Sequence, residues 1–366
     1  MRKCKLSECV KEINDRTTES NQYEVLTSSK NGIFSQEEYF DKQVASKDNT
    51  GYKIIKNGQF TYRSMSDSGT FTINRLEDKE IGIVSPAYPV FEARNIDAEF
   101  LKYYFKSELF NKAILNLSQG STRTALKFKD LIDIEIYFPE IEEQKRIVKI
   151  LKNNDQIIEK YDELIKEKEQ FIKSQFVEMF GNPNENNKGL EIVKLKNICE
   201  NLDNKRIPVT STNRTSGKYP YYGASGIVDY VNDYIFDEDL LLVSEDGANL
   251  IARVTPIAFS ITGKAWVNNH AHVLRFKNKC TQIYVENFFE NLNINQYITG
   301  ITQPKLNQER LNSIDIPIPD IEDQEKYMGI KNLIDKQKFE LEKQKQNYID
   351  LKKGLMQQLL TGKLKV

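Results

Sequence analysis

The sequence predicts an α+β protein in which two globular domains are separated by two long antiparallel coiled-coil helices, arranged as an internal pseudo-two-fold repeat. Two observations lead to this prediction. The stretch from Gly120 to Gln144 recurs without a gap from Gly300 to Gln324. A long charged segment, with apolar residues at heptad spacing, follows each copy. The order along the chain is therefore globule, helix, globule, helix.

Length and charge agree with this organisation. A chain of 366 residues suits two domains of about 130 residues each, together with connecting elements. Lys and Arg number 52 against 53 Asp and Glu, so the whole chain lacks the excess of basic residues that indicates nucleic-acid binding. A balanced total is still compatible with a basic face on each globule if the long helices carry the compensating acids.

The cysteines and the apolar runs indicate where the protein resides. The four cysteines show neither CxxC nor Cys/His metal spacing, which predicts free thiols in a reducing compartment and no zinc site. The chain begins without an apolar signal region, and no run approaches the ~18 apolar residues of a membrane span. We therefore expect a cytoplasmic protein.

The repeat and the changes in composition divide the chain into four segments. They are a first globular domain over 1–138, a central helical region over 139–182, a second globular domain over 183–318 and a distal helical region over 319–366. Within the globular domains, residues 99–116 and 283–298 have helical spacing. Short β-branched and aromatic runs between turn residues predict strands elsewhere.

The first globular domain contains two polar segments that could contact phosphate. One runs from Thr61 to Gly69, and the other from Ser118 to Thr124. The second is a Gly/Ser/Thr loop with one arginine, Arg123, which is typical of a phosphate clamp. Its counterpart in the repeat, Thr299 to Gln303, occupies the same place in the second domain, and this duplication strengthens the prediction.

The central helical region carries two adjacent apolar heptad strings. They are Ile150, Ile157, Leu164 and Phe171, and Leu151, Ile158, Ile165 and Ile172. The predicted helix starts near Pro139, which is followed by acidic residues that favour the positive end of the helix dipole, and it stops at Gly181. About 40 residues at 1.5 Å each give a length of about 60 Å, which exceeds what either globule needs for its own core.

The segment Lys218–Tyr230 in the second globular domain interleaves aromatic residues with small turn residues. Such a surface can present hydroxyls, backbone amides and ring faces to a sugar-phosphate chain or to base edges. The alternative is that the tyrosines pack a small β core.

Both histidines of the chain, His270 and His272, follow in the same domain. Two residues apart on a strand, they are expected to share a face. No carboxylate or cysteine stands at a useful spacing beside them, so we expect hydrogen bonding to backbone or phosphate rather than a metal site.

The distal helical region repeats the design of the central one. It starts near Pro319, stops near Gly362 and carries one apolar heptad string, formed by Ile334, Leu341, Tyr348 and Leu355. Polar residues interrupt the apolar strings at Asn154, Gln337 and Gln344, as expected where polar seam positions fix register. Because each helix leaves one apolar stripe uncovered, we predict an antiparallel pair within one molecule; the alternative is that each helix packs on its own globule.

Motifs for catalysis and cofactor binding are missing from the sequence. There is neither a GxxxxGK[ST] phosphate loop nor a GxGxxG dinucleotide fingerprint. Pro139–Glu140 with Glu143–Lys145 resembles a nuclease pattern, but Pro319–Asp320 with Asp323–Glu325 lacks the lysine, and both copies lie at a helix start. We therefore predict no catalytic, cofactor-binding or metal-binding residues.

These features together make the chain similar to the specificity (S) subunit of type I restriction-modification systems over essentially its full length. The motifs that carry the resemblance are Ile136–Ile147, Gln175–Gly181, Tyr221–Gly226 and Gln357–Leu364. The tryptophan often found near the start of each recognition domain is absent, since the equivalent segments are Arg2–Leu6 and Glu191–Leu195.

The resemblance implies a non-catalytic, sequence-specific DNA-binding subunit. Each globule would be a target-recognition domain that reads one half of a bipartite double-stranded DNA site, and the helices would set the spacing. Two copies of a separate methyltransferase subunit would supply S-adenosylmethionine binding and N6-adenine methylation. An ATP- and magnesium-dependent restriction subunit would add translocation and cleavage.

From both lines of reasoning we select eight candidate DNA-binding residues. They are Arg63, Ser66 and Arg123 in the first domain, and Tyr221, Ser225, Lys264, Asn268 and His270 in the second. The alternative function is a coiled-coil scaffold whose globules bind other proteins, which would show no salt-dependent binding to duplex DNA. An enzyme that acts alone is disfavoured by the missing cofactor motifs.

Overall fold

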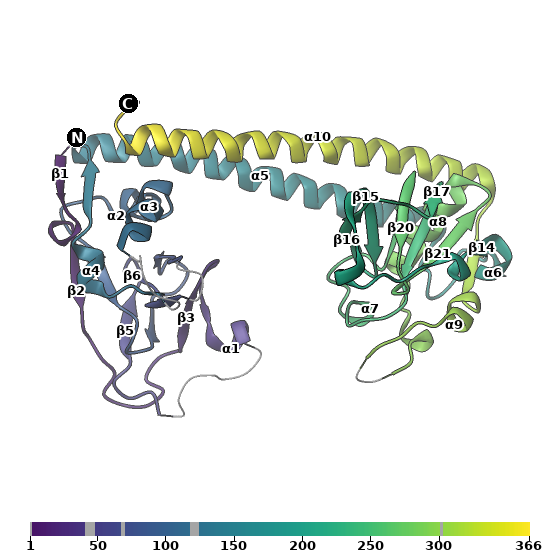
Figure 1. The fold of residues 1–366 in the computed structure, drawn as a ribbon, viewed down its shortest axis with the longest axis horizontal. Coiled ribbons are helices and arrows are strands. Elements are labelled where there is room, and N and C mark those ends of the chain that lie inside the picture. Colours follow the sequence, from purple (N-terminus) through teal and green to yellow (C-terminus); the bar gives the residue numbers. More distant parts are fainter. Residues whose placement is uncertain (1, 41–47, 67–69, 118–123, 301–302) are drawn as a thin grey trace. The chain divides into compact units, whose positions relative to one another are not determined.

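The computed structural model describes residues 2–40, 48–66, 70–117, 124–300 and 303–366 as a mixture of helices and strands. The chain separates into two compact units: unit 1 is Met1–Asp162 with Lys343–Val366, and unit 2 is Glu163–Glu342. Each unit thus contains one globular part and a portion of each long helix, α5 (Ile141–Phe180) and α10 (Ile321–Leu360) (Figure 1). No helix of the described residues is long and apolar enough to cross a membrane.

The globular part of unit 1 combines short strands with short helices. The strands are β1 (Arg2–Lys5), β2 (Val10–Ile13), β3 (Leu26–Ser29), β4 (Gly32–Ser35), β5 (Lys53–Lys56), β6 (Phe60–Thr61), β7 (Met65–Ser66), β8 (Asn74–Arg75), β9 (Ile81–Val84), β10 (Val90–Ala93), β11 (Thr124–Ala125) and β12 (Glu135–Phe138). The helices are the 3-10 helix η1 (Leu6–Glu8), α1 (Gln36–Phe40), α2 (Ala98–Phe105), α3 (Glu108–Leu117) and α4 (Phe128–Ile132).

The core of unit 1 lies on a four-stranded sheet with the order β2-β10-β6-β8. Aromatic side chains dominate it: the Phe60 and Phe91 rings stack at 5.5 Å, and Phe105 from α2 meets Phe60 edge-on at 5.6 Å. The strand pairs β3-β4 and β5-β9 surround a smaller apolar cluster that includes Leu26 and Ile55. The strands β3, β4, β5 and β9 therefore form an outlying group that has its own apolar cluster.

Unit 2 has a related set of elements. Its strands are β13 (Glu191–Lys194), β14 (Cys199–Asn201), β15 (Ser216–Gly223), β16 (Gly226–Val231), β17 (Phe236–Asp237), β18 (Leu240–Ser244), β19 (Ala258–Ile261), β20 (Lys264–Val267), β21 (Ala271–Phe276) and β22 (Asp315–Ile318). Its helices are α6 (Leu195–Ile198), α7 (Asn249–Ala252), α8 (Lys279–Asn291), α9 (Gln308–Asn312) and the 3-10 helices η2 (Asp203–Lys205), η3 (Ser211–Asn213) and η4 (Asn295–Tyr297).

The main sheet of unit 2, with the order β14-β21-β18-β19, corresponds to the main sheet of unit 1. A second four-stranded sheet, β16-β15-β20-β17, packs on a separate apolar cluster that includes Phe236, Val267 and Val273. The duplication seen in the sequence therefore extends to the strand order of the main sheet, while the outlying strands differ between the units.

A shared frame joins each globular part to its long helix. Strand β1 pairs antiparallel with β12 in unit 1, and β13 pairs in the same way with β22 in unit 2. The Leu6 amide donates to the Ile134 carbonyl at 2.9 Å, and the Leu195 amide donates to the Ile314 carbonyl at 2.9 Å. These matching bonds make the entry into α5 equivalent to the entry into α10.

A buried glutamine fixes each of these helix starts. Gln144 Nε2 donates to the Pro139 carbonyl at 2.8 Å, and Gln324 Nε2 donates to the Pro319 carbonyl at 2.7 Å. Each glutamine also bonds its own globular part, through the Asp97 amide in unit 1 and the Thr281 hydroxyl in unit 2. The repeated glutamines at the ends of the sequence repeat therefore couple each globule to its helix.

The helices α5 and α10 run antiparallel beside one another in each unit. Pairs of opposite charge connect them: Lys352 with Asp155 and Lys345 with Asp162 in unit 1, and Lys338 with Glu169 in unit 2 at 2.8 Å. The three lysines and the three acids each recur every seven residues. The helices also pack on the globular cores, through Ile147 and Leu151 in unit 1 and through Ile172 and Phe176 in unit 2, so features of both predicted packing modes are present.

The two apolar strings predicted for α5 differ in burial. Leu151 and Ile172, at the ends of one string, are buried, whereas Leu164 and Phe171 of the other are 41% and 43% exposed. A pair of helices buries one narrow seam on each partner, so the second string is left partly in contact with solvent. On α10, Leu333 and Phe339 are likewise exposed.

Two predicted helical segments are each interrupted. Residues 99–116 form α2 and α3, because Ser107 Oγ donates to the Tyr104 carbonyl and accepts the Phe110 amide, which starts a new helix. The segment 283–298 falls in α8, which begins earlier at Lys279, and in η4. Sequence spacing thus located these helical regions and missed their internal boundaries.

Candidate nucleic-acid interface

The same backbone hydrogen bond occurs in both units. It joins the loop after a strand of the main sheet to the segment just before the last short helix of the globular part. In unit 1 the Leu126 amide, just before α4, donates to the Ser64 carbonyl at 2.9 Å. In unit 2 the Leu306 amide, just before α9, donates to the Glu245 carbonyl at 2.8 Å. We call this pairing the sheet junction, because it brings the loops after β6 and β18 to equivalent places.

A groove of about 820 Å³ lies beside the sheet junction of unit 1. Its walls come from the β3-β4 hairpin, the helix α1 and the segment around β7. Among the described residues that line it, Lys30 and Arg63 are cations and none is Asp or Glu. We call this hollow the unit 1 groove; its described lining suits an anionic or hydrogen-bonding ligand.

Two of the residues predicted in the first domain meet in this groove. Arg63 and Ser66 both line it, and Arg63 is exposed without a hydrogen bond or ion pair to another described residue. Arg123, the third candidate, lies outside the described residues. The structure therefore brings together the two candidates of unit 1 that it describes.

Tyr221 in unit 2 belongs to the core. Its side chain is 1% exposed, its hydroxyl accepts from the Val209 amide at 2.9 Å and lies 3.2 Å from the Val209 carbonyl, and the Arg214 guanidinium stacks on its ring at 4.4 Å. Every face of this side chain is occupied by protein, so the proposed interface leaves Tyr221 out. The alternative prediction, in which the tyrosines of this segment pack a β core, is confirmed for Tyr221. Ser225 is exposed in the turn between β15 and β16.

The remaining candidates of unit 2 flank strand β20. Lys264, at its start, is exposed, and its ammonium lies 4.4 Å from the centroid of the Tyr234 ring. Asn268, just past its end, is buried, and its Oδ1 accepts the His270 amide at 2.8 Å, which shapes the turn. The His270 side chain is 50% exposed, with Nδ1 2.9 Å from the Asp246 carboxylate. Lys264 and His270 thus present polar tips at different ends of one strand, and Asn268 positions His270.

The expectation that His270 and His272 share one face is wrong. Strand β21 begins at Ala271, so His270 belongs to the preceding turn, whereas His272 is in the strand. The side chain of His272 is 1% exposed, against 50% for His270. The strand alternation on which the expectation relied therefore does not extend to His270.

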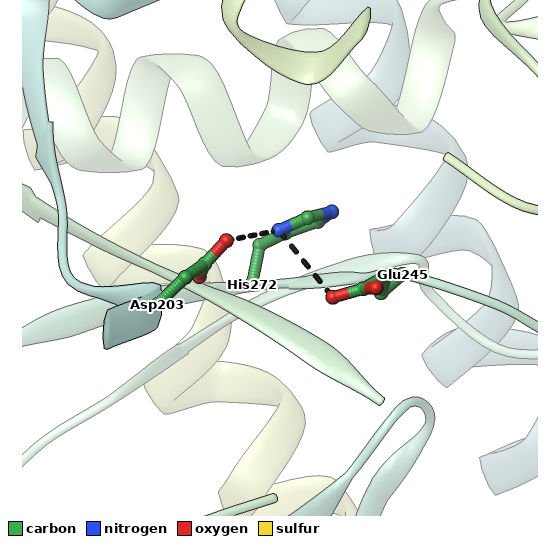
Figure 2. Close-up of side chains that lie close together, drawn as sticks. All are labelled: Asp203, Glu245 and His272. Atoms are coloured by element: carbon green, nitrogen blue, oxygen red, sulfur yellow. Dashed lines mark hydrogen bonds and ion pairs between the residues drawn. The ribbon is translucent and has the colours of Figure 1, made fainter. Parts of the chain in front are cut away.

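A buried charge network surrounds His272 at the sheet junction of unit 2. Figure 2 shows its Nδ1 facing two carboxylates, Asp203 at 2.6 Å and Glu245 at 3.8 Å. Cations complete the network: Arg206 lies 2.7 Å from Glu245 and 3.5 Å from Asp203, and Lys305 lies 3.1 Å from Glu245. The network thereby ties η2, the end of β18 and the segment before α9 to one another.

The network lowers the pKa of both carboxyl groups. Burial by itself would raise the pKa of Asp203, but the hydrogen bond from His272, the Val273 amide and the charge of Arg206 together lower it. Burial would likewise raise the pKa of Glu245, and the hydrogen bonds and charges of Arg206, His272 and Lys305 lower it. Both carboxylates are therefore held in their ionised form.

The ligand atoms of Asp203, Glu245 and His272 lie within 4.8 Å of one another, close enough for a metal ion. The two nitrogens of His272 are already used, since Nε2 lies 2.7 Å from the Leu306 carbonyl and Nδ1 faces Asp203. Arg206 and Lys305 already neutralise Glu245. The arrangement therefore fits a structural charge network better than a metal site or a general base.

Sequence reasoning missed this network and one residue of the unit 1 groove. Asp203, Glu245 and His272 are far apart in the sequence, and the pairing of β14 and of β18 with β21 brings them together. Gln36 lines the unit 1 groove from the start of α1. The spacing of these residues carried no signal that could have revealed either feature.

Comparison with protein families gives one match in each half of the chain. The model described as "Type I restriction modification DNA specificity domain" matches residues 5–170 and again residues 187–351. The two matches correspond to the two copies of the sheet junction and its helix entry.

Individual relatives agree with this match. A candidate type I restriction enzyme specificity subunit from Haemophilus influenzae is 36% identical over 125 residues, which are 34% of this chain and 32% of the relative. The MjaIX specificity subunit from Methanocaldococcus jannaschii is 26% identical over 197 residues, which are 45% of this chain and 46% of the relative. The chain thus spans a third to a half of the length of these relatives.

Solved structures resemble the chain over nearly its whole length. A structure from a study of complex assembly and conformational transition of a type I restriction-modification system has a TM-score of 0.61 at 15% identity, covering 99% of this chain and 98% of the other. The S subunit from M. genitalium has a TM-score of 0.52 at 16% identity, covering 98% and 95%. At these identities the likeness concerns the fold.

Proposed function

Because the chain belongs to the family of type I restriction-modification DNA specificity domains, we propose that it is the non-catalytic specificity subunit of such a system. It would bind double-stranded DNA at a bipartite site, with one half of the site read by each unit. The observation that carries this proposal is the duplication: the family model matches twice, and each match contains its own sheet junction. A protein with two equivalent binding units suits a split site.

We select the proposed DNA-contacting residues by the exposure of their side chains to solvent. In unit 1 we propose Arg63 and Ser66, which line the groove, and we retain Arg123 as a prediction. In unit 2 the exposed candidates are Ser225, Lys264 and His270. A side chain that reads a base specifies one position of the site, whereas a side chain that binds phosphate strengthens binding to all sequences.

The helices would act as an antiparallel coiled coil that sets the spacing of the half-sites. Each is continuous over 40 residues, or about 60 Å, and half-sites one turn of DNA apart need about 34–36 Å. Insertion of one heptad into both helices should change the number of unread base pairs and leave both half-sites intact. A spacer that stays the same would contradict this role.

Two copies of a methyltransferase subunit would bind S-adenosylmethionine and methylate adenine at N6, and a restriction subunit would supply ATP- and magnesium-dependent cleavage. The exposed apolar side chains of the helices are the proposed contact for the methyltransferase. Leu333 and Phe339 of α10 are 58% and 63% exposed, and neither side chain is covered by α5 or by the globular part. Large exposed apolar side chains often mark a contact with another protein. Phe339→Glu should reduce co-purification of the methyltransferase and Phe339→Leu should not; equal recovery with both variants would reject this contact.

We place the protein in the cytoplasm, where its DNA substrate lies. The four cysteines are free thiols in the structure, in keeping with a reducing compartment.

The test of the proposed function is base-resolved detection of methylated adenine in the source organism, with and without this gene. Loss of one split motif when the gene is removed is the expected result. An unchanged pattern, with the gene expressed beside a functional methyltransferase, would overturn the proposal and favour a scaffold that binds proteins.

A further inference from the structure

A basic segment of unit 2, rich in hydroxyl groups, lies between the candidates Lys264 and His270. Residues 206–218 contain three cations and neither Asp nor Glu, in a chain whose total charges nearly balance. We call residues 210–216 the hydroxyl loop. Its exposed polar residues are Thr210, Ser211, Thr212, Asn213, Thr215 and Ser216. Side chains of these types are among the groups that bond the phosphates of DNA.

Tyr221 and Arg214 hold the hydroxyl loop in one shape. The Tyr221 hydroxyl accepts from the Val209 amide at 2.9 Å, and Arg214 Nε donates to the Val209 carbonyl at 3.1 Å. The Arg214 guanidinium stacks on the Tyr221 ring at 4.4 Å. At the other end of the loop, the Asn232 amide donates to the Thr215 carbonyl at 3.0 Å. The backbone of the loop is therefore fixed before a ligand binds, which lowers the entropic cost of binding.

Two lysines without an ion pair lie where the hydroxyl loop joins β15. Lys218 is exposed, and its ammonium lies 5.2 Å from the centroid of the Tyr219 ring. Lys264 is also exposed, with its ammonium 5.9 Å from the same centroid. Arg214, by contrast, pairs with Asp229 at 3.2 Å. Since neither lysine forms an ion pair with another described residue, both can attract an anion from solution.

The segment connects two proposed contact points that lie at opposite ends of β20. At one end Arg206 donates to the Ala271 carbonyl at 2.9 Å, beside His270. In between, an indole of β20 donates to the backbone of the segment at 2.7 Å. At the other end Lys218 and Lys264 share one aromatic ring. The segment thus makes these contact points parts of one surface.

We propose that the hydroxyl loop and Lys218 bind the sugar-phosphate backbone of the second half-site, and that Tyr221 positions the loop without touching DNA. The inference rests on the proposed function and assigns this surface to affinity and orientation rather than to base reading. Phosphate oxygens accept hydrogen bonds from hydroxyl, amide and ammonium groups alike. Such contacts strengthen binding to every sequence and make it depend on salt.

The experiment uses the full chain in complex with its methyltransferase subunits. Affinity is measured between about 50 and 200 mM salt, on duplexes with both half-sites and on duplexes whose second half-site is altered one base pair at a time. Lys218→Gln is compared with the wild type, and Lys277→Gln is the matched control. Lys277 is an exposed lysine of unit 2 that follows β21, at the end of that strand opposite His270.

Lys218→Gln should bind every duplex more weakly and depend less on salt. Loss of one phosphate contact removes about 0.9 from the slope of log affinity against log salt. Over the measured range the wild type should therefore lose about 3.5-fold more affinity than Lys218→Gln, and Lys277→Gln should match the wild type. An unchanged slope would overturn the phosphate contact, and so would a loss of discrimination at a single base pair.

Tyr221→Phe tests the positioning role. It removes the hydroxyl that holds Val209 and keeps the ring on which Arg214 stacks. The salt slope should fall while the base preferences at the second half-site stay the same, and Tyr222→Phe, at the next position of β15, should change neither. Partial unfolding would lower the fraction of active complex at every salt concentration without changing the slope. A slope equal to that of the wild type would therefore overturn the positioning role.

The failure of the proposed function would look different. The wild-type complex itself would then show no preference among the duplexes, before any variant is compared.

Discussion

Unit 1 and unit 2 close the same sheet junction with different chemistry. In unit 1 the Tyr62 hydroxyl donates to the Leu126 carbonyl at 3.1 Å within an apolar surrounding. In unit 2 the buried network of His272, Asp203 and Glu245 takes that place, with Arg206 and Lys305 as counter-charges. The frame beside each proposed reading surface is therefore kept, while the side chains that close it, and the loops around it, differ.

This difference suits a protein that reads two unlike half-sites. Backbone bonds, such as Leu126 to Ser64 and Leu306 to Glu245, place the loops without constraining their sequence. Side chains on the loops can then change the bases that are read without disturbing the helix entries. Damage at one sheet junction should therefore affect one half-site only.

Removal of His272 should cause the largest effect. His272→Ala leaves the buried Asp203 carboxylate without its closest partner, and an unsatisfied buried group that is charged costs more than the roughly 1–3 kcal/mol of a neutral one. Trp266, the one tryptophan of the chain, lies in unit 2 and donates to the Ile207 carbonyl. Its fluorescence during denaturant unfolding should show this loss.

The matched control is His270→Ala, since the His270 and Asp246 pair is partly exposed and such pairs contribute at most about 1 kcal/mol. If both variants unfold at the same denaturant concentration as the wild type, the network does not hold unit 2 together.

The corresponding change in unit 1 should be milder. Tyr62→Phe removes one hydroxyl and leaves the Leu126 carbonyl without that donor, a loss of about 1–3 kcal/mol for a buried group. Hydrogen exchange of the Leu126 amide should accelerate, while amides of β18 and β21 should keep their protection. Faster exchange in unit 2 as well would show that the two junctions are not independent.

Acidification should give the smallest effect, and among the two sheet junctions it should act on that of unit 2. Asp203 and Glu245 have lowered pKa values in the folded state, so their stabilisation is complete above the unfolded values, about 4, and is lost as the pH falls through the folded values. Each unit of depression corresponds to about 1.4 kcal/mol. Unfolding followed by Trp266 fluorescence should depend on pH below about 5, and this dependence should be weaker in Asp203→Asn. An identical pH dependence in that variant would assign it to other groups.

Local patterns predicted the long helices well. Heptad spacing, prolines and glycines gave the regions 139–182 and 319–366, and the helices occupy Ile141–Phe180 and Ile321–Leu360. These signals act over a few residues and need no tertiary contact. The repeat indicated equivalent helix entries, and the matching glutamines Gln144 and Gln324 bear this out.

The candidate site was less accessible from the sequence. Whether Tyr221 faces the core or the solvent depends on the partners of β15, and its ring is covered by Arg214. The burial of His272 and the exposure of His270 depend on where β21 begins. Gln36 at the start of α1 and Arg63 just before β7 are far apart in the sequence, and the fold brings them to one groove. Each of these facts is set by long-range packing, which no local pattern records.

We propose that each unit reads its own half of a split site through one duplicated frame. The matching backbone bonds from Leu6 to Ile134 and from Leu195 to Ile314 define where the globular parts can be exchanged. A chain in which residues 6–134 replace residues 195–314 would carry the first globular part twice. The most direct measurement is base-resolved adenine methylation in cells that carry this hybrid with its methyltransferase. The expected motif consists of two inverted copies of the first half-site, whereas a motif that keeps the original second half would show that the globular parts do not read the half-sites.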